Sequence, residues 1–162
     1  AAREFAEKGA GLRTTLISAA DAWSSRSGGT SGALWGMLLK AVAEQFSDDE
    51  PFTPKQLSTG LLEGLTSVQQ FGKAVLGDKT MVDALEPLVK IFSRSIEQGK
   101  PLTESWSEAA EIALAAAERT EQMIPKIGRA RPHAEASVGT PDPGAISLGL
   151  IAMKISEHMG AK

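Results

Sequence analysis

Apolar residues in the long periodic segments of this sequence recur at intervals of three and four, the spacing of one face of an α-helix. The two clearest segments contain Leu57, Leu61, Leu62, Leu65 and Val68, and Met81, Ala84, Leu85, Leu88, Val89, Phe92 and Ile96. A half-buried β-strand would instead alternate apolar and polar residues. The spacing therefore predicts an all-α fold.

Local chemistry marks the starts of these two helices. Thr53 is a suitable N-cap, Pro54 fits the first helical position and Gln56 can close a capping box. Thr80 and Asp83 repeat the box pattern. We expect helices at residues 2–24, 31–47, 54–72, 80–98, 103–123 and 143–159. Because most connections are short, neighbouring helices should be antiparallel, as in a helical bundle or barrel.

Two of the expected helices have unusual compositions. The helix from Thr103 is rich in alanine, which permits close packing but supplies little apolar surface, so Trp106 is expected to anchor it. The last helix is apolar on nearly all sides over residues 145–153. We expect it to be the most buried helix of the chain.

The overall composition limits the classes of function. The 162 residues fit one domain, residues 1–162, and the net charge of −3 without a basic tract argues against a nucleic-acid partner. Cysteine, a membrane-spanning apolar stretch and a signal peptide are absent, so we expect no membrane partner and a cytoplasmic location. Residues 1–6 read as the middle of a helix without a cap, which indicates an N-terminally incomplete domain.

The first of three candidate sites is Ser-Gly-Gly-Thr-Ser-Gly at residues 27–32. Paired glycines let a backbone approach a ligand closely, and the following helix offers unpaired N–H groups that bind anions. Gly29, Thr30 and Ser31 are therefore candidate phosphate-binding residues. The alternative is a plain turn in which Thr30 or Ser31 caps the next helix. Gly32 and Gly36, as small residues, would also allow helices to pack closely.

The second candidate site, residues 72–81, has two interpretations. It is an ordinary loop that ends in an N-cap, with Met81 as core filler, or a slot for a flat ring. In the slot, Gly72 and Met81 would form the walls, with Lys79 and Thr80 near the polar edge. The residues of this segment alone favour the ordinary loop.

The third candidate site lies in the long connection between residues 125 and 143. Loops of that length in compact domains often carry function. Asp142 as N-cap and Pro143 at the first helical position explain that dipeptide locally. Arg129 and Arg131 are costly to order unless a carboxylate or phosphate receives them, so they are candidate anion ligands.

Taken in order, four blocks resemble the nucleotide-binding domain of the dihydroxyacetone kinase family. They are Gly-Gly-Thr-Ser-Gly at residues 28–32, Gly-Asp-Lys-Thr-Met with Asp-Ala-Leu at residues 77–85, Gly-Arg-Ala at residues 128–130, and Asp-Pro-Gly-Ala at residues 142–145. The resemblance covers most of the chain. It implies an antiparallel barrel of about eight helices, some six of them here, that binds ATP or ADP at one rim.

The resemblance also implies a role for each matching residue. By position, the cofactor-binding residues would be Gly29, Thr30 and Ser31 at the phosphates, Gly72 and Met81 at the adenine, Arg129 near the phosphates, and Asp142, Pro143 and Gly144 closing the rim. The chain departs from the family at Arg131-Pro132, where many relatives have serine and an aromatic residue.

The activity implied by the resemblance is phosphate transfer to dihydroxyacetone or a related short ketose, which a separate ketose-binding domain or subunit holds. Relatives bind Mg²⁺ through an aspartate-rich loop that would precede Ala1, so we expect this segment alone to be inactive. Some relatives consume ATP, whereas in others a phosphotransferase-system protein rephosphorylates bound ADP. The alternative is a non-catalytic module that senses nucleotides or docks a regulator.

Overall fold

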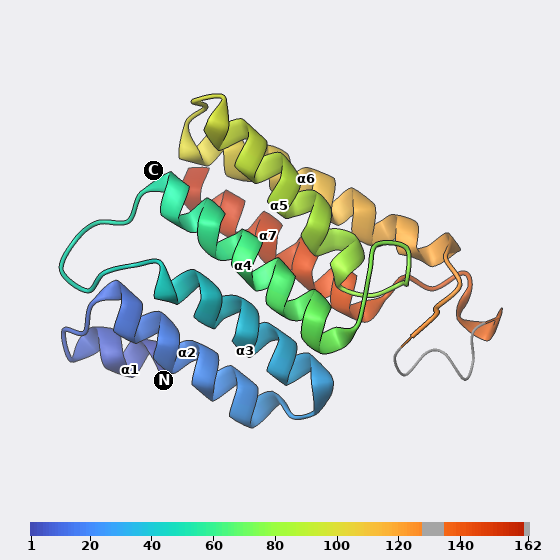
Figure 1. Cartoon of the computed structure of the whole chain (residues 1–162), viewed down its shortest axis with the longest axis horizontal. Helices are drawn as coiled ribbons and strands as arrows, with labels where there is room; N and C mark the ends of the chain where they lie inside the picture. The colour runs from blue at the N-terminus through green and yellow to red at the C-terminus, as the bar shows by residue number, and fades with distance from the viewer. Residues whose placement is uncertain (128–134, 161–162) are drawn as a thin grey trace. The chain divides into compact units, whose positions relative to one another are not determined.

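The computed structural model describes residues 1–127 and 135–160. Within these ranges the chain forms seven α-helices, two 3-10 helices and no β-strand, which confirms the predicted all-α class (Figure 1). The elements are α1 (Ala2–Glu7), α2 (Leu12–Ser27), α3 (Gly29–Glu44), α4 (Pro54–Gly72), α5 (Val82–Glu97), α6 (Leu102–Arg119), η1 (Thr120–Gln122), η3 (Glu135–Ser137) and α7 (Pro143–Gly160). They divide between two compact units, unit 1 (Ala1–Lys73) and unit 2 (Ala74–Lys162).

In unit 1, α3 packs against both α2 and α4 (Figure 1). Glycines make these contacts close. A Cβ atom added to Gly36 would lie 2.8 Å from Ser24 Cβ in α2, and one added to Gly60 would lie 2.6 Å from Val42 Cα in α3. Both distances are shorter than real side chains permit, so the predicted packing role of Gly36 is confirmed.

The prediction of a single helix over residues 2–24 is wrong, because the helix is interrupted between α1 and α2. Gly9 adopts φ 78°, its N–H donates to Ala6 O at 3.0 Å, and the Ala10 N–H donates to Phe5 O at 3.0 Å. This pair of bonds is a Schellman motif, which ends a helix at a left-handed residue. The helical spacing of apolar residues continues across this interruption, so the sequence pattern did not reveal it.

The N-terminus of α2 is capped by a residue from a distant part of unit 1. Asp48 Oδ1 accepts from the Thr14 N–H at 2.8 Å, and Asp48 Oδ2 accepts from the Thr14 hydroxyl at 2.6 Å. These bonds lower the pKa of Asp48 below its ordinary value. The cap requires a residue without a side chain at Gly11, where an added Cβ would lie 2.4 Å from Asp48.

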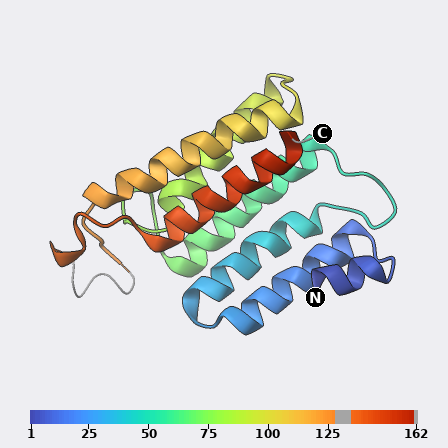
Figure 2. The same cartoon turned by 180° about the vertical axis from the view of Figure 1, so that it is seen from behind.

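In unit 2, α6 packs against α5 on one side and α7 on the other, and α6 and α7 lie side by side in Figure 2. Trp106 of α6 is buried, contacts Phe92 of α5 edge-on with ring centroids 5.5 Å apart, and donates its indole N–H to Ala152 O of α7 at 3.0 Å. The predicted anchoring role of Trp106 is therefore confirmed.

The prediction that the last helix is the most buried is wrong. Eight residues of α5 are buried, against four of α7, and Leu150 and Ile155 of α7 are 56% and 41% exposed. The burial of a helix depends on which neighbouring helices cover it, and its mean apolarity alone does not determine that. α7 contacts α6 closely but leaves a second apolar side uncovered in unit 2.

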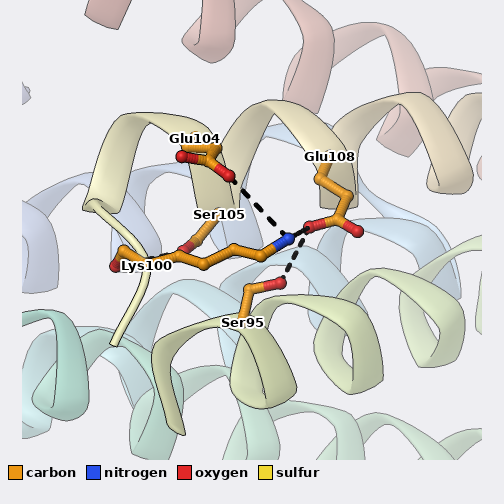
Figure 3. A network of polar contacts seen from close by, with 5 residues as sticks. All are labelled: Ser95, Lys100, Glu104, Ser105 and Glu108. Carbon is orange, nitrogen blue, oxygen red and sulfur yellow. Dashed lines mark hydrogen bonds and ion pairs between the residues drawn. The ribbon is translucent and has the colours of Figure 1, made fainter. Parts of the chain in front are cut away.

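A polar network fixes the turn between α5 and α6 (Figure 3). Glu108 Oε2 accepts from the Lys100 ammonium at 2.8 Å and from the Ser95 hydroxyl at 2.9 Å. Glu104 lies 3.8 Å from the same ammonium. The bond from Lys100 is the main reason that the pKa of Glu108 is lowered, and the bond to Glu108 likewise raises the pKa of Lys100.

The other predicted helices agree with the structure except at their ends. α4 has the predicted bounds and the predicted capping box, in which the Gln56 N–H donates to Thr53 Oγ1 at 3.3 Å and the Thr53 N–H donates to Gln56 Oε1 at 2.8 Å. α3 and α5 begin two residues from their predicted starts, and the end of α6 tightens into η1. No helix in the described ranges is both long enough and apolar enough to cross a membrane.

Candidate functional site

The first predicted segment forms the turn between α2 and α3. Gly28 and Gly29 have φ 60° and 61°, a conformation that favours glycine, and α3 starts at Gly29 without a side-chain cap. Thr30 and Ser31 lie in the first turn of α3 and are exposed. The alternative in which one of them is the N-cap is therefore wrong. The first N–H groups of such a helix have no intrahelical partner, so this exposed turn is suited to an anion.

Gly72 is the last residue of α4, in unit 1, and its successor Lys73 adopts the left-handed conformation at φ 50°. The Lys73 N–H donates to Gln69 O and completes the helix end. Gly72 is partly exposed. Its predicted contact with adenine stays a prediction.

The loop before α5 is organised around the buried carboxylate of Asp83. Asp83 Oδ1 accepts from the Gly77 N–H at 2.6 Å, and Oδ2 accepts from the Thr80 N–H at 2.7 Å. Of the two bonds in the predicted capping box, the one from the Thr80 N–H to the Asp83 carboxylate is therefore present. The Thr80 hydroxyl accepts from the Val82 N–H at 3.2 Å. The side chain of Asp83 thus holds the loop at two points, Gly77 and Thr80.

Met81 lies against the start of α7. A Cβ atom added to Gly144 would lie 3.3 Å from Met81 Cβ and 3.0 Å from Asp142 Oδ2. Gly144 therefore leaves the room that lets these residues approach. Met81 is 6% exposed, which agrees with the interpretation of Met81 as core filler. The structure brings Met81, Asp142 and Gly144 together within unit 2.

Asp142 is the N-cap of α7, as predicted. Its Oδ2 accepts from the Ala145 N–H at 2.7 Å, and its own N–H donates to the Thr120 hydroxyl at 2.8 Å. Burial raises the pKa of Asp142, and the nearby carboxylate of Asp83 raises it further. The N–H groups of Ala145 and Gly144 and the charge of Lys79 oppose that shift.

A buried lysine joins the loop before α5 to the segment before α7. Lys79 is 4% exposed, and its ammonium donates to Ser137 O at 2.6 Å. A second connection runs along the outside of the same loop, where the Lys126 N–H donates to Asp78 O at 3.2 Å and the Lys126 ammonium lies 3.7 Å from Asp78 Oδ1.

The predicted site residues therefore divide between the two units. Gly29, Thr30, Ser31 and Gly72 belong to unit 1, and Met81, Asp142, Pro143 and Gly144 belong to unit 2. Arg129, with Arg131, lies outside the described residues. The roles predicted for these residues in cofactor binding stay predictions.

Sequence reasoning missed Thr120 and underrated Lys79 and Asp83. Asp83 was expected to serve only Thr80, and its second bond, to Gly77, depends on how the loop folds back. Thr120 precedes its partner Asp142 by 22 residues, so no local pattern could connect them. Lys79 was predicted only to lie near the polar edge of the slot, whereas the structure buries it.

Metal-binding residues do not cluster in the part of the chain that the structure describes, where no group of three or more His, Asp or Glu side chains could hold an ion. The described features that fit an anionic ligand are instead backbone groups at helix starts, above all the uncapped start of α3.

In the described ranges the chain is an all-helical domain whose helix N-termini are partly capped and partly uncapped. Its family follows from comparison with known proteins. The chain belongs to the DAK2 domain family, whose model matches residues 1–157. The predicted resemblance to dihydroxyacetone kinases is therefore confirmed.

Curated relatives are similar over almost the whole chain. The L-erythrulose kinase of Pectobacterium atrosepticum is 47% identical over 96% of this chain, and the D-erythrulose kinase of Mycolicibacterium smegmatis is 41% identical over 97%. The dihydroxyacetone kinase of Komagataella pastoris is 31% identical over 88%. The matches cover 26%, 28% and 24% of these proteins, so the chain spans about a quarter of their length.

Proposed function

We propose that residues 1–162 form one nucleotide-binding domain of a kinase that phosphorylates a short ketose. The domain binds ATP or ADP together with Mg²⁺, and the phosphate passes to dihydroxyacetone, erythrulose or a related ketose held on a separate domain or subunit. The observation that carries the proposal is the 47% identity to an L-erythrulose kinase over 96% of the chain.

The described geometry supports this proposal at two places. The start of α3 presents exposed Thr30 and Ser31 and free helical N–H groups, which suit the phosphates. The start of α7 is held against the loop before α5 through Gly144 and Met81. Transfer of a phosphoryl group depends mainly on such positioning and on neutralising charge.

A chimera tests the proposed activity. The segment of the Pectobacterium L-erythrulose kinase that aligns with this chain is replaced by residues 1–162, and phosphate transfer from ATP to L-erythrulose is measured. We expect the chimera to transfer phosphate, because the replaced segment is similar throughout. A chimera that folds and binds ATP but transfers no phosphate would instead support a nucleotide-sensing module.

A matched pair of variants tests the predicted phosphate contact. Thr30→Val keeps the shape of the side chain but removes its hydroxyl, and we expect the affinity of the chimera for ADP to fall. Thr59→Val is the control, because the exposed Thr59 hydroxyl donates only to Lys55 O within α4. Equal affinities in the two variants would remove Thr30 from the site.

The phosphoryl donor is decided by the nucleotide content of the purified protein. We expect ATP to be an ordinary substrate if purified protein contains no nucleotide. A stoichiometric ADP that survives purification would point to a phosphotransferase-system protein as the donor.

A further inference from the structure

The described part of unit 2 buries three charged residues, Asp78, Lys79 and Asp83, and the resemblance assigns a cofactor contact to none of them. Lys79 and Asp83 are the least exposed of the three. Lys79 and Asp83 lie on either side of Met81 in sequence and are 4% and 2% exposed. Charged side chains are rarely this buried unless they bond to specific partners. Their partners are therefore informative about what the two residues do.

Lys79 combines burial with an unfavourable backbone conformation. Its φ of 62° lies in the left-handed region, which residues other than glycine seldom adopt. The ammonium of Lys79 donates to Ser137 O, at 2.6 Å and 58 residues away in sequence. Ser137 ends η3, five residues before Asp142. Lys79 thus ties the loop before α5 to the segment that leads into α7.

Asp83 holds the other side of the same loop. Its two carboxylate oxygens accept from the N–H groups of Gly77 and Thr80, so the backbone on either side of Lys79 is fixed to the first turn of α5. Met81 lies between Thr80 and Asp83, so the bond from the Thr80 N–H to Asp83 Oδ2 spans Met81.

Asp142 completes the arrangement from the side of α7. It caps α7 through the Ala145 N–H and is itself held by the Thr120 hydroxyl. Asp142 lies beside the loop that Lys79 and Asp83 hold, because a Cβ atom added to Gly144 would lie 3.0 Å from Asp142 Oδ2 and 3.3 Å from Met81 Cβ. Lys79, Asp83 and Asp142 therefore form one cluster, which we call the entrance cluster.

We propose that Lys79 and Asp83 are positioning residues of the nucleotide site, which hold Met81 against Asp142 and Gly144 before the nucleotide arrives. This inference rests on the proposed function. Groups that are already in place when a ligand binds do not have to be ordered at that moment, and this raises affinity. The bonds of the entrance cluster are all internal to unit 2 and need no ligand.

Hydrogen exchange on the unsubstituted chain tests whether the cluster is formed in advance. Without nucleotide, we expect the amides of Gly77, Thr80 and Asp142 to be protected, because each donates to a side chain of unit 2. Exchange of these amides at the rate of an unfolded peptide would overturn the proposal, and this result does not depend on any variant folding.

Substitution of Lys79 tests the effect on binding. In the chimera, we expect Lys79→Met to weaken ADP binding by about tenfold or more, since small displacements of binding groups are costly. Lys79→Arg keeps a charged donor and should restore most of the affinity. Lys90→Met is the charge control, because Lys90 is an exposed residue of α5 paired with Glu86.

A core variant separates positioning from general destabilisation. Phe92→Leu weakens the buried centre of α5 away from the entrance cluster, and it should lower thermal stability without changing ADP affinity. If Lys79→Met binds ADP as tightly as Phe92→Leu does, Lys79 is merely structural and the proposal is wrong. If the unsubstituted chimera fails to bind ADP, the proposed function itself fails.

Discussion

Asp142 makes the stability of unit 2 depend on pH in an unusual direction. Its folded pKa lies above its ordinary value of 3.8, mainly because of burial. The folded state therefore binds the proton more tightly than the unfolded state does. The resulting stabilisation is fully present below pH 3.8 and is lost as the pH rises through the folded pKa of Asp142.

We predict that Asp142→Asn removes the loss of stability that occurs as the pH rises through the folded pKa of Asp142. The amide oxygen of asparagine can still accept from the Ala145 N–H, but the side chain does not ionise. As the pH rises from about 4 toward neutrality, unfolding free energies of the wild type should fall relative to the variant. Urea denaturation of both proteins at several pH values measures the difference, and a constant difference would contradict the prediction.

Asp48 should show the opposite behaviour in unit 1. Its folded pKa lies below 3.8 because its carboxylate accepts from Thr14, so its stabilisation is present above pH 3.8 and is lost as the pH falls through the folded pKa. We predict that Asp48→Asn reduces the thermal stability at neutral pH but has little effect in acid. Melting temperatures measured at both pH values test this, and an equal loss in acid would contradict it.

At the scale of helices, the sequence predicted those features that depend on residues close together in the chain. The box of Thr53 and Gln56, the cap at Asp142 and the spacing of the apolar residues in α4 and α5 were all readable. What the sequence could not reveal comes from distant segments. Asp48 caps α2 across 34 residues, and the burial of α7 depends on which of its sides meets α6.

The candidate site followed the same division. Met81, Asp142 and Gly144 were identified from residue patterns, and in the structure a Cβ atom added to Gly144 would lie 3.3 Å from Met81 Cβ and 3.0 Å from Asp142 Oδ2. The bonds that hold them, from Lys79 to Ser137 and from Asp142 to Thr120, join residues that no motif connects. Contacts of this kind depend on how the loops fold back onto the packed helices, which a local sequence pattern does not specify.

Close helix packing in unit 1 leads to a prediction about Gly60. Alanine at this position improves the intrinsic preference for helix by about 1 kcal/mol. However, its Cβ would lie 2.6 Å from Val42 Cα, so α3 and α4 must move apart. We expect Gly60→Ala to destabilise the protein by about 1–3 kcal/mol, the usual cost of overpacking.

Chemical denaturation measures this change, with Gly160→Ala as the control. Gly160 is the last residue of α7, and an added Cβ there meets nothing within 4 Å. A neutral or stabilising effect of Gly60→Ala would mean that the contact between α3 and α4 is less rigid than described.

At the scale of the whole molecule, one family domain coincides with two compact units. The DAK2 match runs over residues 1–157 and therefore covers both Ala1–Lys73 and nearly all of Ala74–Lys162. The predicted site residues are also shared between the units. Because one family match runs over both units, we expect them to unfold together, as a single cooperative domain would.

The distribution of the tryptophans gives a way to observe this. Trp23 and Trp35 stack in unit 1 with ring centroids 5.3 Å apart, whereas Trp106 is buried in unit 2, and the sequence contains neither a fourth tryptophan nor a tyrosine. Fluorescence from each unit can therefore be isolated by substitution. Trp106→Phe leaves emission from unit 1 alone, and a double Phe variant of Trp23 and Trp35 leaves emission from unit 2 alone. We expect both variants to lose their native emission in step with their own loss of helical circular dichroism, because a cooperative domain melts as one body. The molecule thus carries an optical reporter in each half.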